Sequence, residues 1–167
     1  VEPAIILNCD PGDLFVVRNV ANLVPPCEIT SSNESYHGTS AALEFAVNAL
    51  EVDSIIVLGH AQCGGIKALM DRQKTENKSF IHKWMSQLHT VKDHIYADTN
   101  YQTQQERYHA CEELGIVHSL ENLMTFPWIA SRVAEGKLEL HGWYYDIRNS
   151  ELYALKAGTG QFQKVSL

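Results

Sequence analysis

The stretch from Ile55 to Met70 constrains the fold of this chain more than any other part of the sequence. It opens with a run of Ile, Val and Leu that is too short for a helix and ends at Gly59, which predicts a buried strand. Gly64 and Gly65 then allow the backbone to turn tightly into a helical segment. We therefore expect a strand, a loop and a helix in succession, and open α/β sheets place their sites in such loops.

The loop of this unit carries His60 and Cys63, spaced as His-x-x-Cys. An imidazole nitrogen and a thiolate are ligands that zinc favours, and this spacing lets both reach one ion. A helix N-terminus beside the loop also lowers a thiol pKa and offers N–H groups to an anion. A second interpretation stays open, in which His60 caps the strand and Cys63 is a small buried hydrophobic residue. Two ligands alone do not make a zinc site, because a third protein ligand is needed.

Composition and charge exclude several classes of protein. The 167 residues have a formal net charge of -7 and no Lys/Arg cluster, so nucleic acid is not an expected partner. No apolar run approaches the ~20 residues of a membrane span, and no signal-peptide pattern opens the chain. The four cysteines are scattered, which favours a reducing compartment. The length is typical of one domain with a sizeable core.

The spacing of apolar residues predicts the other elements. Strands are expected over 14–18, running on toward 24, over 138–147, and over 151–155 as a closing hairpin; helices are expected over 39–50, 80–96, 104–124 and 127–136. Segments 27–37 and 71–79 are predicted to be polar connections. On the helix over 104–124, the apolar stripe is expected at Cys111, Leu114, Val117, Leu120 and Leu123. This alternation predicts an α/β fold: a mostly parallel central sheet with an antiparallel C-terminal edge strand, flanked by helices.

Three stretches together resemble the β-class carbonic anhydrases, and the plant-like branch most closely. They are PGDLFVVRNVANLVPP at 11–26, GHAQCGG at 59–65 and HGWYYD at 141–146, and the likeness covers essentially the whole chain. The resemblance implies a zinc lyase that reversibly hydrates carbon dioxide to bicarbonate, with Zn²⁺ as its cofactor. It places two zinc ligands at His60 and Cys63. In this family the metal lowers the pKa of a water molecule, which then attacks carbon dioxide.

The resemblance also indicates a missing segment. In the family, the remaining cysteine ligand and a catalytic Asp–Arg pair lie in a Cys-x-Asp-x-Arg motif, on a central strand just before the equivalent of residues 1–3. That motif does not occur in this chain, so we expect one N-terminally incomplete domain over 1–167 and no catalytic residue from that pair. Cys9-Asp10 is not expected to replace the motif, because no Arg follows at the required spacing. The cysteines other than Cys63 are expected to be ordinary turn or core residues.

Several further residues match family positions around the substrate. Phe15, Val20 and Phe45 match the apolar wall that holds carbon dioxide, and the Gly64 N–H matches the donor to the bound anion. Relatives of the plant-like branch often have Tyr where this chain has Phe45, and at that position pocket and core remain alternatives. Arg18 is expected to be structural, in an ion pair or an interface.

The family resemblance also implies partners and raises competing functions. It implies a homodimer or a higher homo-oligomer, located in the cytoplasm or in an organelle stroma or matrix. Residues 143–145 are compatible with sheet extension between subunits and equally with a core strand. Hydrolysis of carbon disulfide or carbonyl sulfide on the same scaffold, and an inactive or metal-depleted binding domain, remain alternatives. A phosphate-loop nucleotide binder is disfavoured, because neither glycine-rich phosphate motif occurs.

Overall fold

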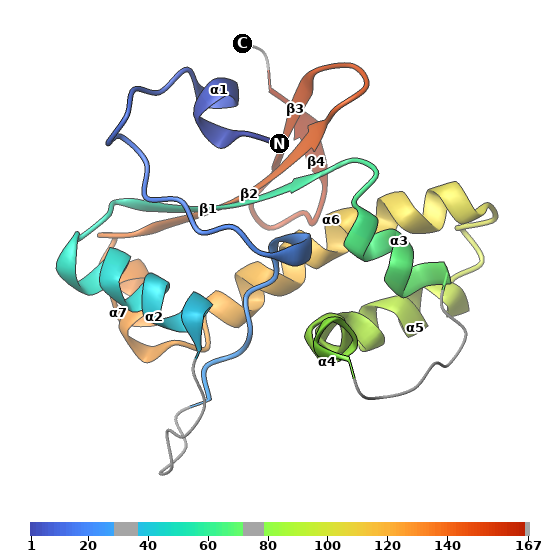
Figure 1. Ribbon diagram of the computed structural model, residues 1–167, viewed down its shortest axis with the longest axis horizontal. Helices are drawn as coiled ribbons and strands as arrows, with labels where there is room; N and C mark the ends of the chain where they lie inside the picture. Colours follow the sequence, from blue (N-terminus) through green and yellow to red (C-terminus); the bar gives the residue numbers. More distant parts are fainter. Residues whose placement is uncertain (29–36, 72–78, 166–167) are drawn as a thin grey trace.

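Figure 1 shows the computed structural model, which describes residues 1–28, 37–71 and 79–165. The segments expected as polar connections, 27–37 and 71–79, lie mostly outside these ranges. The elements are α1 (Pro3–Leu7), η1 (Val20–Asn22), α2 (Gly38–Glu44) with its π-helical continuation η2 (Phe45–Ala49), β1 (Ser54–His60), α3 (Gly64–Asp71), α4 (Phe80–Met85), η3 (Ser86–Leu88), α5 (His89–Ala97), α6 (Gln104–Leu123), α7 (Pro127–Ala134), β2 (Glu139–Asp146), β3 (Glu151–Leu155) and β4 (Phe162–Lys164). None of the described helices is long and apolar enough to cross a membrane.

The strands form one sheet in the order β1-β2-β3-β4. β1 pairs with β2 in parallel, whereas β2 with β3 and β3 with β4 are antiparallel, which confirms the α/β fold with an antiparallel C-terminal end. β2 has a partner on both edges, so residues 143–145 are part of an interior strand and cannot extend the sheet between subunits. The short strand β4 was not expected from the sequence. Among the described residues, β1 lies at the edge of the sheet.

The long helix α6 lies across one face of β1 and β2 (Figure 1). Two glycines on that face allow the close approach. A Cβ atom at Gly59 would lie 2.7 Å from Ile116 Cδ1, and one at Gly142 would lie 2.9 Å from Ile116 Cγ2. Because side chains alternate along a strand, His60 belongs to the opposite face from Gly59. The glycines therefore set the distance between α6 and the strand that carries His60.

The buried face of α6 agrees only in part with the expected stripe. Cys111 and Leu123 are fully buried as expected, whereas Leu114, Val117 and Leu120 are only half-buried, and the buried face also carries polar residues. Ser119 accepts a hydrogen bond from the Val24 N–H at 3.2 Å and donates one to the Asn22 carbonyl at 3.1 Å. The Asn122 amide donates to the Val24 carbonyl at 2.8 Å. These polar side chains are buried because the irregular segment beside them needs partners for its backbone groups.

The N-terminal part of the chain contradicts the strand expected over 14–18. These residues have no strand partner within the described residues, and Phe15, Val16 and Val17 are exposed. Strand propensity reports how well side chains fit a pleated surface, and it does not supply a neighbouring backbone. The helix expected over 80–96 is likewise interrupted by the tighter turn η3, whose Leu88 is fully buried.

Candidate metal and active site

The predicted loop follows β1, and its backbone is held at both ends. The Ala61 N–H donates to the Tyr145 carbonyl at 2.9 Å, which continues the pairing of β1 with β2. Gln62 has φ +60°, a left-handed conformation that is uncommon outside glycine. Lys67 N–H bonds the Cys63 carbonyl at 2.9 Å, so the first turn of α3 begins directly after the loop. The sequence expectation of strand, loop and helix is therefore confirmed, with His60 as the last strand residue.

The side chains of His60 and Cys63 lie close enough that each shifts the pKa of the other. His60 Nδ1 lies 2.9 Å from the Ala61 carbonyl, which can only accept, so Nδ1 carries a proton and Nε2 is free to accept one or to bind a metal. The hydrogen bond to Cys63 raises the pKa of His60, against the effect of burial. Burial alone raises the pKa of the Cys63 thiol, but bonds from His60 and from the N–H groups of Ile66 and Gly65 together lower it. Each side chain thus favours the charged form of the other.

Glu112 on α6 lies beneath this loop and was not expected from the sequence to be near the site. Glu112 is only 5% exposed, and its Oε1 accepts a hydrogen bond from the Cys63 N–H at 2.9 Å. Oε2 accepts from the Tyr144 hydroxyl at 3.0 Å, and that hydroxyl lies 3.1 Å from His109 Nδ1. Burial raises the pKa of Glu112, and the Cys63 N–H and the Tyr144 hydroxyl oppose that rise. Helical spacing was the signal that could have indicated its burial, because Glu112 lies on the same face of α6 as the apolar Ile116, four residues further on.

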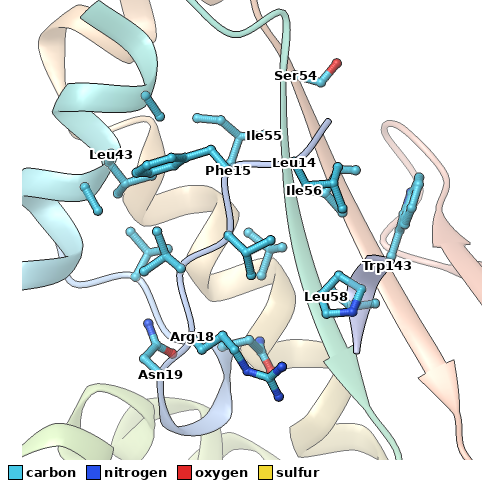
Figure 2. A pocket seen from close by; sticks show the side chains of 18 of the residues that line it. Leu14, Phe15, Arg18, Asn19, Leu43, Ser54, Ile55, Ile56, Leu58 and Trp143 are labelled. Atoms are coloured by element: carbon cyan, nitrogen blue, oxygen red, sulfur yellow. The ribbon is translucent and has the colours of Figure 1, made fainter. Parts of the chain in front are cut away.

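A cavity of about 630 Å³ runs between β1 and the irregular segment over 13–19. Figure 2 shows Phe15 and Arg18 on one side of it and Ile56 and Leu58 of β1 on the other, with Trp143 of β2 beside them. His60 also lines this cavity. The open side of β1 therefore has an apolar surface that leads to the predicted metal ligand.

The predicted substrate residues divide into two pairs. Phe15 lines the cavity, and its ring centroid lies 5.9 Å from that of Phe45. Phe45 is 53% exposed, so it is not a core residue of this chain. Val20 packs against the start of α3, because a Cβ at Gly65 would lie 2.7 Å from Val20 Cγ1. Gly64 is the first residue of α3, next to Cys63.

The donor set of the loop suits zinc but is incomplete. One imidazole nitrogen and one sulfur are appropriate zinc ligands. Across residues 1–28, 37–71 and 79–165, no three His, Cys, Asp or Glu side chains are grouped so as to hold a metal. Cys9 lies in the turn after α1, where its thiol donates to the Leu7 carbonyl, and it does not join His60 and Cys63. The described residues therefore offer two ligands of a site that needs at least three.

Arg18 lies in the ion pair that was expected for it. Its guanidinium bonds Glu2 Oε2 at 2.9 Å and the Val1 carbonyl at 2.9 Å. Both charged side chains are more than half exposed, so the contribution to stability is small. The bond nevertheless ties the start of the chain to the segment that borders the cavity.

Comparisons with known proteins agree with this geometry. The family described as "Carbonic anhydrase" matches residues 1–152. The chloroplastic β-carbonic anhydrase 5 of Arabidopsis thaliana is 44% identical over 147 residues, which are 87% of this chain and 47% of that protein. The mitochondrial β-carbonic anhydrase 6 of the same plant is 37% identical over 154 residues, 91% of this chain and 51% of that protein. The chain thus spans about half the length of these curated relatives.

Solved structures match over the whole chain. The β-carbonic anhydrase CcaA has a TM-score of 0.88 and 31% identity, with 100% of this chain and 73% of that chain covered. A β-carbonic anhydrase from the fungus Sordaria macrospora, described as tetrameric, has a TM-score of 0.71 and 28% identity, covering 99% of this chain and 75% of its own. Sequence, fold and the loop after β1 agree, and this chain belongs to the β-class carbonic anhydrases.

Proposed function

We propose that this chain is part of a zinc-dependent enzyme that interconverts carbon dioxide and bicarbonate. The observation that carries the proposal is the His60–Cys63 pair at the end of β1, an imidazole and a thiol suited to zinc, each of which shifts the pKa of the other. Zinc binds the deprotonated forms of both groups, so metal binding to such ligands releases protons. Family membership supports the same reaction.

The residues of the chain then have distinct tasks. The Ala61 carbonyl fixes the His60 ring with Nε2 directed at the metal, as hydrogen-bond partners of ligating histidines do. The chemistry that Zn²⁺ supplies when bound is Lewis acidity, which makes water acidic enough to act as a nucleophile near neutral pH. Phe15, Val20 and Phe45 provide an apolar wall for carbon dioxide. The Gly64 N–H, which has no partner inside its helix, donates to the bound anion.

The third zinc ligand and the Asp–Arg pair come, in this proposal, from a segment that precedes Val1 in the whole protein. Curated relatives are about twice as long as this chain, which leaves room for such a segment. β1 has one strand partner among the described residues, and the cavity along its other side is lined by Val1 and His60. A strand added there would place its side chains next to His60. This is the N-terminally incomplete domain that the sequence predicts.

We propose a homo-oligomer as the working form, in the cytoplasm or in an organelle stroma or matrix. Exposed apolar side chains support self-association, among them Phe15, Val16, Val17 and Phe45. Solved relatives described as tetrameric point the same way, and curated relatives are described as chloroplastic and mitochondrial. Light scattering of the whole protein tests this part: a monomer at all concentrations would exclude it.

Zinc analysis combined with stopped-flow hydration of carbon dioxide tests the proposed reaction. The whole protein, including the N-terminal segment, is expected to hold one zinc per chain and to hydrate carbon dioxide. Cys63→Ser should lose zinc and hydration together, whereas Cys27→Ser, a half-buried thiol elsewhere, is the matched control and should change neither. Residues 1–167 alone are expected to bind zinc more weakly and to be inactive. Full zinc content and full activity in Cys63→Ser would contradict the proposal.

A further inference from the structure

Glu112 is unusual among the buried residues of this protein because it is a carboxylate. Ionisable side chains are rarely buried without partners, and burial costs free energy unless every oxygen is bonded. The other buried polar residues of α6, Ser119 and Asn122, each bond the backbone of the irregular segment near Val24. Glu112 makes the corresponding contact to a different irregular segment, the loop after β1.

The contact fixes an unfavourable backbone conformation. Glu112 Oε1 accepts from the Cys63 N–H at 2.9 Å. Gln62 has φ +60°, and a non-glycine residue in that region persists only where its surroundings hold it. The Cys63 N–H belongs to the peptide group that directly follows Gln62, so its bond to Glu112 provides such a restraint.

The carboxylate is itself held from the opposite side. The Tyr144 hydroxyl donates to Glu112 Oε2 at 3.0 Å, and Tyr144 is 4% exposed within β2. Its ring packs edge-on against His109 and against Tyr153 of β3. The strand that pairs with β1 therefore determines where the Glu112 carboxylate lies, and through it where the loop backbone lies.

We infer that Glu112 is the positioning residue of this loop: it holds the Cys63 backbone so that the sulfur faces His60. With its N–H fixed by Glu112, Cys63 is held at the start of α3 with its side chain buried and near enough to His60 for the two to interact. The structural part of this inference stands on contacts within the chain. Its consequence for zinc rests on the proposed function.

Two measurements test the inference on the whole protein. The first is amide hydrogen exchange of Cys63 after zinc has been removed, which reports the restraint without any metal. The second is the rate at which zinc is lost to a chromogenic chelator. Glu112→Ala removes the acceptor, and Glu112→Gln keeps an oxygen in its place. Ser119→Ala is the matched control, because it removes a buried hydrogen-bonding group from the same helix away from the loop.

Glu112→Ala is expected to lose amide protection at Cys63 and to bind zinc about 10–100-fold more weakly, the usual effect of removing a partner of a metal ligand. Glu112→Gln should restore most of both, and Ser119→Ala should leave both near the wild-type values despite its loss of stability. If Glu112→Ala does not fold, Tyr144→Phe keeps the ring, removes the donor to Oε2, and is expected to change both quantities in the same direction.

Unchanged amide protection in Glu112→Ala would overturn the inference whether or not zinc binds. Equal zinc loss from Glu112→Ala and Ser119→Ala would overturn its consequence for the metal. A wild-type protein that binds no zinc, but in which Glu112→Ala still loses amide protection, would refute the proposed function and leave the positioning role intact.

Discussion

The two faces of β1 are stabilised very differently. On one face, Val57 and Gly59 are buried against α6, and Ile116 fills the space that a side chain at Gly59 would need. On the other face, Ile56 and Leu58 are half-buried and border the cavity. The predicted metal ligand His60 belongs to this open face.

The comparison explains how an open site can be well ordered. His60 is exposed to the cavity, but the loop that follows it is bonded through Cys63 to Glu112 on the closed face. Catalytic and binding groups are best held by rigid elements behind them. The closed face of β1 thus supplies the rigidity, and the open face supplies access.

The largest difference that we predict between the two sides concerns thiol reactivity. Burial, together with the charge of Glu112, raises the pKa of Cys111 to about 12. Three units above the usual value reduce the Cys111 thiolate at pH 8 about 1000-fold relative to an ordinary thiol, so labelling of Cys111 should be far slower than labelling of the half-buried Cys9. Peptide mapping after timed iodoacetamide treatment measures both rates, with Cys9→Ser to assign the signal. Comparable labelling of the two cysteines in the folded protein would mean that the core between α6 and α3 is open to solvent.

Truncating Ile116, whose side chain contacts both β1 and β2, directly tests the packing of α6 against the sheet. Ile116 is fully buried between Gly59 and Gly142, so Ile116→Ala should lower the free energy of unfolding by about 2–5 kcal/mol. Ile5→Ala, on α1 beside the open side, removes a residue that is 80% exposed and should change it by less than about 0.5 kcal/mol. Urea unfolding of both variants gives the comparison. A similar loss from the two substitutions would remove the distinction between the sides.

Adding one methyl group to the closed face is expected to cost less than truncating Ile116. Gly59→Ala should destabilise the protein by about 1–3 kcal/mol, because the new Cβ would lie 2.7 Å from Ile116 Cδ1. Ile116→Val removes that atom, so the double variant should show less than the sum of the two losses. Gly38→Ala is the control, because no atom lies within 4 Å of the added group. Strict additivity in the double-mutant cycle would contradict the proposed contact.

The smallest predicted effect lies at the start of α6. Interaction with Thr103, chiefly the hydrogen bond from its N–H at 2.7 Å, holds the pKa of Glu106 below its usual value of 4.5. A carboxyl whose pKa is lower in the folded state adds stability above the unfolded value, and that stability is lost as the pH falls through the folded value. Wild-type protein should therefore lose slightly more stability below pH 4.5 than Glu106→Gln, which keeps the capping geometry without a titrating group. Unfolding curves at several pH values measure the difference, and parallel curves would exclude this contribution.

Much of the site could be predicted from the sequence because its signals are local. The apolar run before Gly59, the His-x-x-Cys spacing and the two glycines after it lie within a few residues of one another. Local sequence was enough to predict the strand, the loop and the helix that bring His60 and Cys63 together. Whether they hold zinc remains a prediction.

Other features depended on contacts between distant parts of the chain. The segment over 14–18 has the composition of a strand, but a strand also needs a neighbouring backbone, which none of the described residues provides. Hydrophobic spacing predicted Cys111 and Leu123 on the buried face of α6 but not Glu112 and Ser119, which are buried by bonds to segments far away in the sequence. Hydrophobic periodicity indicates which side chains leave water on folding. It contains no information about hydrogen-bond partners far away in the sequence.

The sequence by itself determined the identity of the loop and the order of the elements around it, because both follow from residues that are neighbours along the chain. Only the tertiary structure decided which face of β1 is covered and which stays open. It also brought Glu112, 49 residues away from Cys63, beneath the loop. The physical reason is that a buried carboxylate is tolerated only where the fold brings donors to it, and the donors here come from β2 and from the loop itself.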